Sequence, residues 1–377
     1  MPLPLYDMQQ TKPKKAQNGH LGLWFERFFT GYAENFSSID KDTKSNWLKE
    51  TAALGQGLGS LQYLHQKAVS LRLLAQAQNG QAKVFHCTSS FVTGLGNPHP
   101  VENGFLWHHS LGVPYLPGSA VKGLIRSFIE TAVADEALRK NRLGEWFGTE
   151  DKKDIAERAG SFIFLDALPI APCNINVEIM TPHMGNWYSN GAKAQNIAQN
   201  LPGDWHDPVP VSYLIAKNIK LQFIILPRTK EAITQLAEIW QALEHALEWL
   251  GAGAKTAIGF GQFVVDTSEE AKLVTVAQEL HQQQQQIALK AQASELELKI
   301  IEFNEAFTGL PQGLPNGDIK IVELFNCIAE LIPLFVQEGS EHERMQLKEA
   351  IKTLLAEKQI KPSKNKEKAF KSQLNAL

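Results

Sequence analysis

The order of strand-like and helix-like segments in the middle of the chain constrains the fold more than any other feature of the sequence. Four segments carry the alternation or the apolar run of a strand, and two carry the helical spacing of apolar residues. In chain order they read β-α-β and again β-α-β, with elements expected near residues 83–92, 119–134, 161–167, 219–226, 233–250 and 262–266. This split β-α-β order predicts an α+β domain with a ferredoxin-like sheet, the layout that RNA-recognition domains use.

An insertion separates the two halves of this pattern. Residues 175–181 predict one more strand, because Ile175, Val177 and Ile179 alternate with polar side chains. Residues 182–210 then contain repeated proline and glycine, which favour neither helix nor strand. We therefore expect a loop insertion near 182–210 inside the domain.

The rest of the chain predicts helices. Residues 21–78 have helical spacing and follow an arm, residues 1–20, that we expect to be flexible. Beyond Asp266 the sequence predicts a glutamine-rich helix, a helical hairpin and a lysine-rich end, which is either a solvated tail or a weak polyanion contact. The expected parts are an N-terminal arm and helical region, the ferredoxin-like domain, and a helical extension with a basic tail, at residues 1–81, 82–268 and 269–377.

The composition excludes several classes of protein. The net charge of −3 means that any nucleic-acid contact must come from local patches. Cys87, Cys173 and Cys327 lie far apart, which argues against a disulfide framework and a cysteine zinc site and suits a reducing cytoplasm. No apolar run reaches the length of a membrane span. We expect a cytoplasmic protein with no membrane contact, no metal and no cofactor.

A glycine turn leads into the helix expected at 119–134. Gly118 permits the turn and Ser119 can cap the helix, which leaves the next amides pointing at solvent. Lys122 and Arg126 lie one turn apart on the face away from the apolar residues. Free amides and two cations form an anion site, with phosphate as the expected anion. The alternative is a capped amphipathic helix with two solvated cations.

A second glycine-rich segment, "GAGAKTAIGFG", follows the helix expected at 233–250. Its glycines would let the backbone approach a ligand closely, while a lysine supplies charge. Glycine is also the ordinary residue after a helix, so this segment alone leaves both interpretations open. The candidate residues are Gly251, Gly253, Lys255, Thr256, Gly259 and Gly261.

Three stretches together resemble the RAMP superfamily, the ferredoxin-like RNA-binding subunits of CRISPR effector complexes. "PGSAVKGLIR" is similar to the family's P-G-S-S-x-K-G-x-x-R signature, and "GAGAKTAIGFGQF" is similar to its glycine-rich loop. The stretch from "TPH" to "PVPV" resembles the small RAMP subunit that caps the backbone of type III-B (Cmr) complexes near the 3′ end of the guide RNA. The resemblance covers residues 82–267, and Ala120 departs from it where the family often has a second serine.

The resemblance implies partners and site residues. The implied partners are a CRISPR guide RNA with its target RNA duplex, and other RAMP and small helical subunits of the effector complex. The two glycine segments would follow one phosphate path, so recognition would depend on phosphate and shape rather than base sequence. The loop after the inserted strand would be structural or partner-facing, through Thr181, Pro182, His183 and Tyr188. Its Trp187, Tyr188 and Trp205 could stack on bases or anchor against a neighbouring subunit.

Histidines before the cationic helix raise an enzymatic alternative. His99, His108 and His109 could supply the acid and base of a RAMP endoribonuclease that processes guide precursor or target RNA. The other interpretation is hydrogen-bonded structural histidines in a polar loop. The sequence therefore supports a non-catalytic RNA-binding and assembly subunit first. An endoribonuclease and a pure protein scaffold are the rivals.

Overall fold

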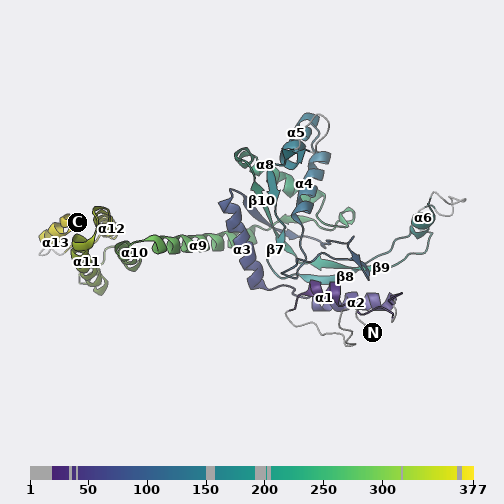
Figure 1. Cartoon of the computed structure of the whole chain (residues 1–377), viewed down its shortest axis with the longest axis horizontal. Helices are drawn as coiled ribbons and strands as arrows, with labels where there is room; N and C mark the ends of the chain where they lie inside the picture. The colour runs from purple at the N-terminus through teal and green to yellow at the C-terminus, as the bar shows by residue number, and fades with distance from the viewer. Residues whose placement is uncertain are drawn as a thin grey trace. The chain divides into compact units, whose positions relative to one another are not determined.

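The computed structural model describes residues 19–33, 36–39, 41–149, 158–191, 201, 205–315, 317–362 and 367–377. The chain divides into two compact units, one that ends at Gln278 and one that begins at Glu279. Figure 1 shows the elements of both, and each unit is described by itself. The arm expected at residues 1–20 lies outside the described residues except for Gly19 and His20.

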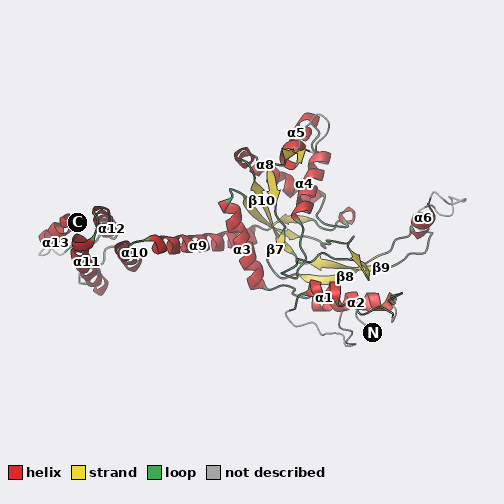
Figure 2. Ribbon diagram, in the orientation of Figure 1, coloured by secondary structure: helices red, strands yellow, loops and turns green. Residues whose placement is uncertain are grey.

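A five-stranded antiparallel sheet forms the centre of the first unit (Figure 2). Its order is β11-β1-β10-β6, and β7 also pairs with β10. Of the four strands predicted in the split β-α-β pattern, β1 is the first, β6 and β7 together are the second, β10 is the third and β11 is the fourth. Across the sheet they therefore lie in the order fourth, first, third, second. The α+β class expected from the sequence is confirmed. The strands are β1 (Gln81–Cys87), β6 (Phe162–Phe164), β7 (Leu168–Pro169), β10 (Lys220–Pro227) and β11 (Phe263–Val265).

Helices cover both faces of this sheet. On one face Phe85 and Phe223 pack with Trp240 of α8 (Leu236–Trp249), and α4 (Gly118–Ala132) packs beside α8. On the other face α3 (Leu61–Ala77) contacts β1, β10 and β7. Strand alternation explains both layers, because successive side chains of β1 and β10 point to opposite faces.

A buried ion pair ties α3 to the start of α9 (Thr267–Gln292). Arg72, 4% exposed, donates from both terminal nitrogens to the Glu270 carboxylate at 2.6 and 2.8 Å. Glu270 also accepts the Val84 N–H at 2.9 Å, and Leu273 and Ala277 are fully buried. The first turns of α9 therefore belong to the first unit. The two compact units divide after Gln278, beyond the boundary that the sequence predicts after residue 268.

The N-terminal helices are part of the same unit rather than a separate region. Helices α1 (Leu21–Arg27) and α2 (Lys41–Leu54) contribute to one core with the sheet, and α2 packs on the hairpin of β8 (Asn174–Met180) and β9 (Val211–Lys217). The hairpin pairs in register from Asn174↔Lys217 to Met180↔Val211. The insertion near 182–210 thus leaves from its tip. Strand β9 was missed by the sequence analysis.

Several expected elements differ in detail. The alternation from Thr88 to Val92 does not extend β1, which ends at Cys87. The helix expected at 233–250 is two helices, α7 (Lys230–Thr234) and α8, separated at Gln235. The remaining short elements of the unit are β2 (Pro98–His99), β3 (Glu102–Asn103), α5 (Glu136–Phe147), β4 (Gly148–Thr149), β5 (Arg158–Ala159) and α6 (Gly185–Asn190).

The second unit is helical and has its own core. The predicted hairpin is present as α11 (Ile319–Glu338) and α12 (Glu341–Glu357), and Val322 of α11 is 46% exposed. The glutamine-rich helix ends before Ser294, whose capping box with Glu297 begins a separate helix, α10 (Glu295–Phe307).

The basic tail is partly folded. Residues from Glu367 to Ala376 form α13, and Leu374 is buried while Phe370 packs edge-on against Phe325 of α11. The prediction of a solvated tail is wrong for this part, because its apolar side chains join the core of the second unit. Lys364 and Lys366 lie outside the described residues. Among the described helices, none combines the length and the apolar composition needed to cross a bilayer.

Candidate nucleic-acid interface

The first turn of α4 is closed by a carboxylate rather than left open. Pro117 is the residue before the helix, and Ser119 lies inside it without a capping bond, so the predicted cap is wrong. The Gly118 N–H instead donates to Asp166 Oδ1 at 2.7 Å. A Cβ on Gly118 would lie 2.1 Å from the Phe164 carbonyl oxygen, so this glycine permits contact with β6.

The cations of α4 are on its exposed face, as the helical spacing predicts. Lys122 Nζ donates to the Phe147 carbonyl oxygen at 3.1 Å, and Arg126 Nε pairs with Glu130 at 2.9 Å. The Arg126 side chain remains 54% exposed, so a ligand can replace water or Glu130 as its partner. Gly123 has no neighbour within 4 Å of a built Cβ and therefore does not serve a close helix contact.

A shallow hollow extends this cationic face toward the edge strand β6. Gly118, Ser119 and Lys122 line one side of it, and Arg228 lines the other. Arg228 directly follows β10 and donates to the Gly160 carbonyl oxygen at 3.2 Å. The sequence analysis missed Arg228, because only the pairing of β10 with β6 brings it toward α4.

Most glycines of the 251–261 loop serve the packing of the loop itself. A Cβ on Gly253 would lie 2.1 Å from the Val92 carbonyl oxygen, and one on Gly261 would lie 1.9 Å from that of Ala252. Gly251 would likewise meet the Phe260 carbonyl oxygen at 2.7 Å. All three have positive φ. The expectation that they bring a ligand close is therefore replaced by an internal role.

The loop amides are also largely engaged within the protein. Ala252 N–H donates to the Gly261 carbonyl at 2.7 Å, Ala254 N–H to that of Val92 at 2.8 Å, and Gly261 N–H to that of Ser90 at 2.8 Å. These bonds attach the two arms of the loop to each other and to the segment after β1. They leave the tip of the loop as the part that a ligand could approach.

The tip runs from Lys255 to Gly259. Lys255 adopts a left-handed conformation at φ 62°, ahead of a 3₁₀ turn at Thr256–Ile258. Its Nζ lies 5.9 Å from the centre of the Tyr213 ring. Gly259, at φ 90°, has no atom within 4 Å of a built Cβ. Of the four loop glycines, Gly259 alone faces open space.

The two glycine segments lie beside opposite edges of the sheet. Gly118 packs against the end of β6, whereas the loop leads directly into β11. These are the two edge strands, separated by three strand spacings or about 14 Å. The segments therefore cannot hold one phosphate together.

Described residues on the two sides of the loop at the tip of the β8–β9 hairpin contact one another. Val209 N–H donates to the Pro182 carbonyl oxygen at 3.2 Å, and His183 Nδ1 bonds the His206 carbonyl oxygen at 3.0 Å. Thr181 continues directly from β8. Tyr188 and Trp205 are 78% and 69% exposed. Large exposed aromatic rings on a projecting loop are typical of a surface that contacts a partner.

Two of the histidines singled out by the sequence, His99 and His108, are engaged in structure. His99 stacks on Phe25 with ring centres 4.0 Å apart, bonds the Phe25 carbonyl oxygen through Nε2, and accepts the Val101 N–H at Nδ1. Burial lowers the pKa of His99, and the bond to Phe25 opposes that shift. Both ring nitrogens therefore have structural partners.

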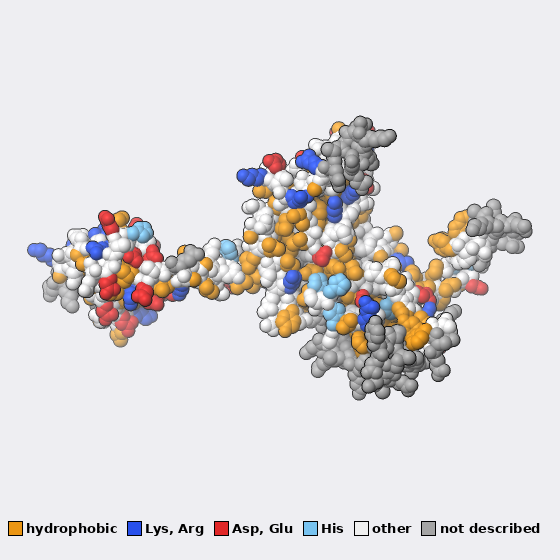
Figure 3. Space-filling model, viewed as in Figure 1, with side chains coloured by type: hydrophobic (Ala, Val, Ile, Leu, Met, Phe, Trp, Pro, Cys, Tyr) orange, Lys and Arg blue, Asp and Glu red, His pale blue; other side chains and the backbone are white. Residues whose placement is uncertain are grey.

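His108 is fixed in one tautomer. Its Nδ1 accepts the N–H groups of Ser110 at 3.3 Å and Leu111 at 3.2 Å, so the ring proton sits on Nε2. Burial, aided by Lys67, lowers the pKa of His108. His20 bonds the carbonyl oxygens of both His108 and His109, and Figure 3 shows histidine side chains gathered on the face that it draws.

These histidines predict acid sensitivity. Because the folded-state pKa of His99 lies below the usual value of about 6.5, the unfolded chain takes up its proton first. The stability from neutral His99 is thus present above about pH 6.5 and is lost as the pH falls below it.

We expect the melting temperature of His99→Gln to be lower than that of the wild type at pH 7.5. Between pH 7.5 and pH 5 it should also depend less on pH than that of the wild type. His109→Gln, at an exposed ring, should keep the wild-type pH dependence. Equal slopes for all three proteins would contradict the structural role.

Part of this chain is similar to known proteins. Residues 84–264 match the model of the RAMP superfamily. "CRISPR system Cmr subunit Cmr6" of Pyrococcus furiosus is 29% identical over 233 residues, which cover 48% of this chain and 66% of the relative. "CRISPR system CMR subunit Cmr6" of Saccharolobus solfataricus is 25% identical over 170 residues, 45% of this chain and 50% of the relative. The chain thus spans between half and two thirds of the length of these relatives.

Solved structures give partial similarity. One chain of a cryo-EM structure of the Type III-B Cmr-beta bound to cognate target RNA aligns with a TM-score of 0.45 and 19% identity, over 60% of this chain and 74% of that one. The crystal structure of Cmr6 from Pyrococcus furiosus aligns with a TM-score of 0.30 and 26% identity, over 50% of this chain and 97% of that one.

Proposed function

We propose that the protein is a non-catalytic guide-RNA-binding and assembly subunit of a type III-B CRISPR effector complex, because residues 84–264 match the model of the RAMP superfamily. It caps the protein backbone of the complex near the 3′ end of the guide. The curated relatives, both named as Cmr6 subunits, support this assignment. The observation that carries it is the exposed cationic face of α4, with Lys122 and Arg126 beside the turn at Gly118.

The proposed contacts are to phosphates. A guide can carry any spacer sequence, so a subunit that holds it must recognise backbone and shape. Lys122, Arg126 and Arg228 supply cations at one edge of the sheet, and Lys255 supplies one at the other. Because these edges of the sheet are about 14 Å apart, the cations at one edge and Lys255 at the other would contact different phosphates of the same RNA strand. The carboxylate of Asp166 at the first amide of α4 makes the lysine and arginine side chains, rather than the helix terminus, the main contacts.

The geometry of the histidines favours binding over catalysis. A general base needs a free lone pair within reach of the proton that it removes. Nδ1 of His108 is already occupied by two amide hydrogens, and both nitrogens of His99 have protein partners. We therefore propose binding of guide and target RNA without cleavage. Incubation of the protein with labelled guide precursor and target RNA checks this, and cleavage abolished by His108→Ala or His109→Ala would support the endoribonuclease instead.

The cationic face gives the direct test of RNA binding. Lys122→Ala combined with Arg126→Ala should weaken guide binding without unfolding the protein, because both side chains are outside the core. We expect the slope of log affinity against log salt to fall by about one to two units, equally for unrelated guide sequences. Filter binding over a salt series measures this, with a thermal melt of each variant.

A matched control removes the same charge elsewhere on the first unit. Lys140 and Lys272 are 73% and 61% exposed and lie on α5 and α9. Lys140→Ala combined with Lys272→Ala should leave the salt slope unchanged. An equal loss in both double variants would mean a response to net charge alone, and a loss that differs between guide sequences would contradict backbone recognition.

The loop at 181–210 is the proposed contact to a neighbouring protein subunit. Its exposed Tyr188 and Trp205 offer the large rigid rings that protein interfaces favour. Pro182 and His183 hold the loop through bonds to Val209 and His206. This division assigns RNA to the cationic edge residues and protein contacts to the hairpin tip.

A further inference from the structure

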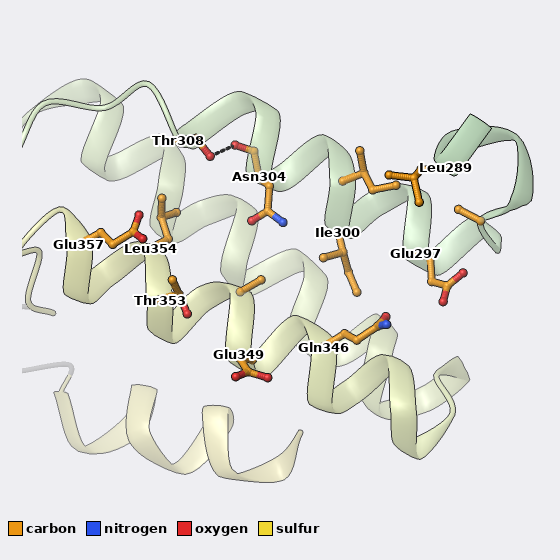
Figure 4. A pocket seen from close by; sticks show the side chains of 13 residues that line it. Leu289, Glu297, Ile300, Asn304, Thr308, Gln346, Glu349, Thr353, Leu354 and Glu357 are labelled. Atoms are coloured by element: carbon orange, nitrogen blue, oxygen red, sulfur yellow. Dashed lines mark hydrogen bonds between the residues drawn. The ribbon is translucent and has the colours of Figure 1, made fainter. Parts of the chain in front are cut away.

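The second unit contains a groove that the proposed function does not use. It runs between α10 and α12, with Leu289 of α9 at one end (Figure 4). Its cavity volume is about 650 Å³. Ile300 and Leu354 form an apolar floor that the core of the unit holds in place. Leu289, by contrast, is 64% exposed at the rim.

The charged residues that line this groove all have one sign. Glu297, Glu349 and Glu357 line it, and no lysine, arginine or histidine is among the described residues that do. Glu349 and Glu357 are exposed on α12. Lys290, the cation next to Leu289, is paired with Glu305 at 2.8 Å. The groove therefore combines an apolar floor with acidic walls.

The length of the groove fits one kind of ligand. The lining residues run from Glu297 to Thr308 on α10 and from Gln346 to Glu357 on α12, three turns of each helix or about 16 Å. A helix of about three turns has this length, and its apolar side chains at helical spacing can enter a groove between two helices.

We propose that the α10–α12 groove binds a basic amphipathic helix of another protein chain. Apolar residues one turn apart on that helix pack on Ile300 and Leu354, and flanking lysines or arginines face Glu349 and Glu357. The glutamate walls repel phosphate, which disfavours nucleic acid as the occupant. The proposal does not depend on RNA binding by residues 84–264, because the second unit lies outside that range.

The test uses the full chain and two designed peptides. The first is a fluorescein-labelled helical peptide of about four turns, with leucines on one face and lysines on the others. In the second, every lysine is replaced by glutamate. Fluorescence anisotropy should show binding of the first peptide and none of the second. Binding of both, or of neither, would overturn the proposal.

Variants then locate the binding. Glu349→Lys combined with Glu357→Lys should weaken the lysine peptide about tenfold at low salt. Glu323→Lys combined with Glu330→Lys makes the same charge change on α11, outside the groove, and should have little effect. Leu289→Ser should also weaken binding, whereas Ile287→Ser, at a residue 67% exposed that does not line the groove, should not. Equal effects within either pair would mean that the peptide binds elsewhere.

Crosslinking tests the groove in the assembled complex. A photoreactive phenylalanine at Thr353, an exposed residue of the groove, should crosslink to a protein segment with basic residues and helical apolar spacing. The same group at Glu323 should not capture that segment. Crosslinks from Thr353 to RNA, to an acidic segment, or to nothing would overturn the proposal.

Discussion

Ending the chain after residue 268 is expected to destabilise the first unit by at least about 3–5 kcal/mol, whereas ending it after Gln278 is expected to leave that unit folded. The shorter chain loses Glu270, and Arg72 then remains in the interior without its carboxylate. Removal of one partner of a buried ion pair costs about 3–5 kcal/mol, because the other charge is left uncompensated. A domain is stable by only about 5–15 kcal/mol, so this loss is large.

Two further losses act in the same direction. Leu273 and Ala277, both fully buried, are also missing from the shorter chain, so apolar surface beneath α9 becomes exposed to water. The Val84 N–H loses its acceptor on Glu270 at the same time. Together these contacts explain why the second unit can be separated only after Gln278.

Denaturant unfolding of both truncated chains measures the difference. Glu270→Gln in the longer chain isolates the ion pair and should account for most of the loss. Glu248→Gln, at an exposed residue of α8, is the matched control in the same chain and should have no effect. Equal stability of the two truncated chains would contradict a role for α9 in the first unit. The longer chain should also retain the RNA affinity of the full protein, if the second unit serves only protein contacts.

The strand and helix order was predictable because it depends on local periodicity. Phe85 and Phe223 lie on the face toward Trp240, as the two-residue period of their strands requires. The apolar stripe of α4, with Val121 and Ile125, likewise puts Lys122 and Arg126 outside. Each of these assignments needs only the sequence of its own segment.

Features decided by distant partners were not predictable in this way. Strand β9 is defined by its pairing with β8, and the insertion separates the two strands in the sequence. The start of α9 reads as a polar solvent-exposed helix, and only its ion pair with the buried Arg72 of α3 reveals that Glu270 contacts the interior of the first unit. Asp166 caps α4 across the edge of the sheet in the same manner. By contrast, the capping box at Ser294 and Glu297 is a local signal that the sequence did contain.

The loop glycines show the same limit in the candidate site. The sequence analysis singled out four glycines and a lysine of this loop, and all five have positive φ. What each glycine touches could not be read from spacing, because Val92 and Ser90 come from another part of the chain. The expectation that the loop glycines let the backbone approach a ligand treated Gly259 and Gly261 alike. The structure separates them, and the separation can be measured.

Gly261→Ala is expected to destabilise the protein by about 2–5 kcal/mol, and Gly259→Ala by only about 1–2 kcal/mol. Both residues have positive φ, at 71° and 90°, where a side chain costs about 1–2 kcal/mol. At Gly261 the new Cβ would also lie 1.9 Å from the Ala252 carbonyl oxygen, and relief of such a clash costs about 1–3 kcal/mol more. At Gly259 the Cβ would enter open space.

Because Gly259 variants stay folded, they test the tip of the loop as an RNA contact. Gly259→Val should weaken guide binding by steric exclusion with little change in salt slope, whereas Lys255→Ala should lower the slope by about one unit. Filter binding over a salt series, together with thermal melts, distinguishes the two effects. If Gly261→Ala melts like Gly259→Ala, the internal role assigned to Gly261 is wrong. If folded Gly259→Val binds guide RNA as the wild type does, the tip makes no close backbone contact, and Lys255 acts there only as a charge.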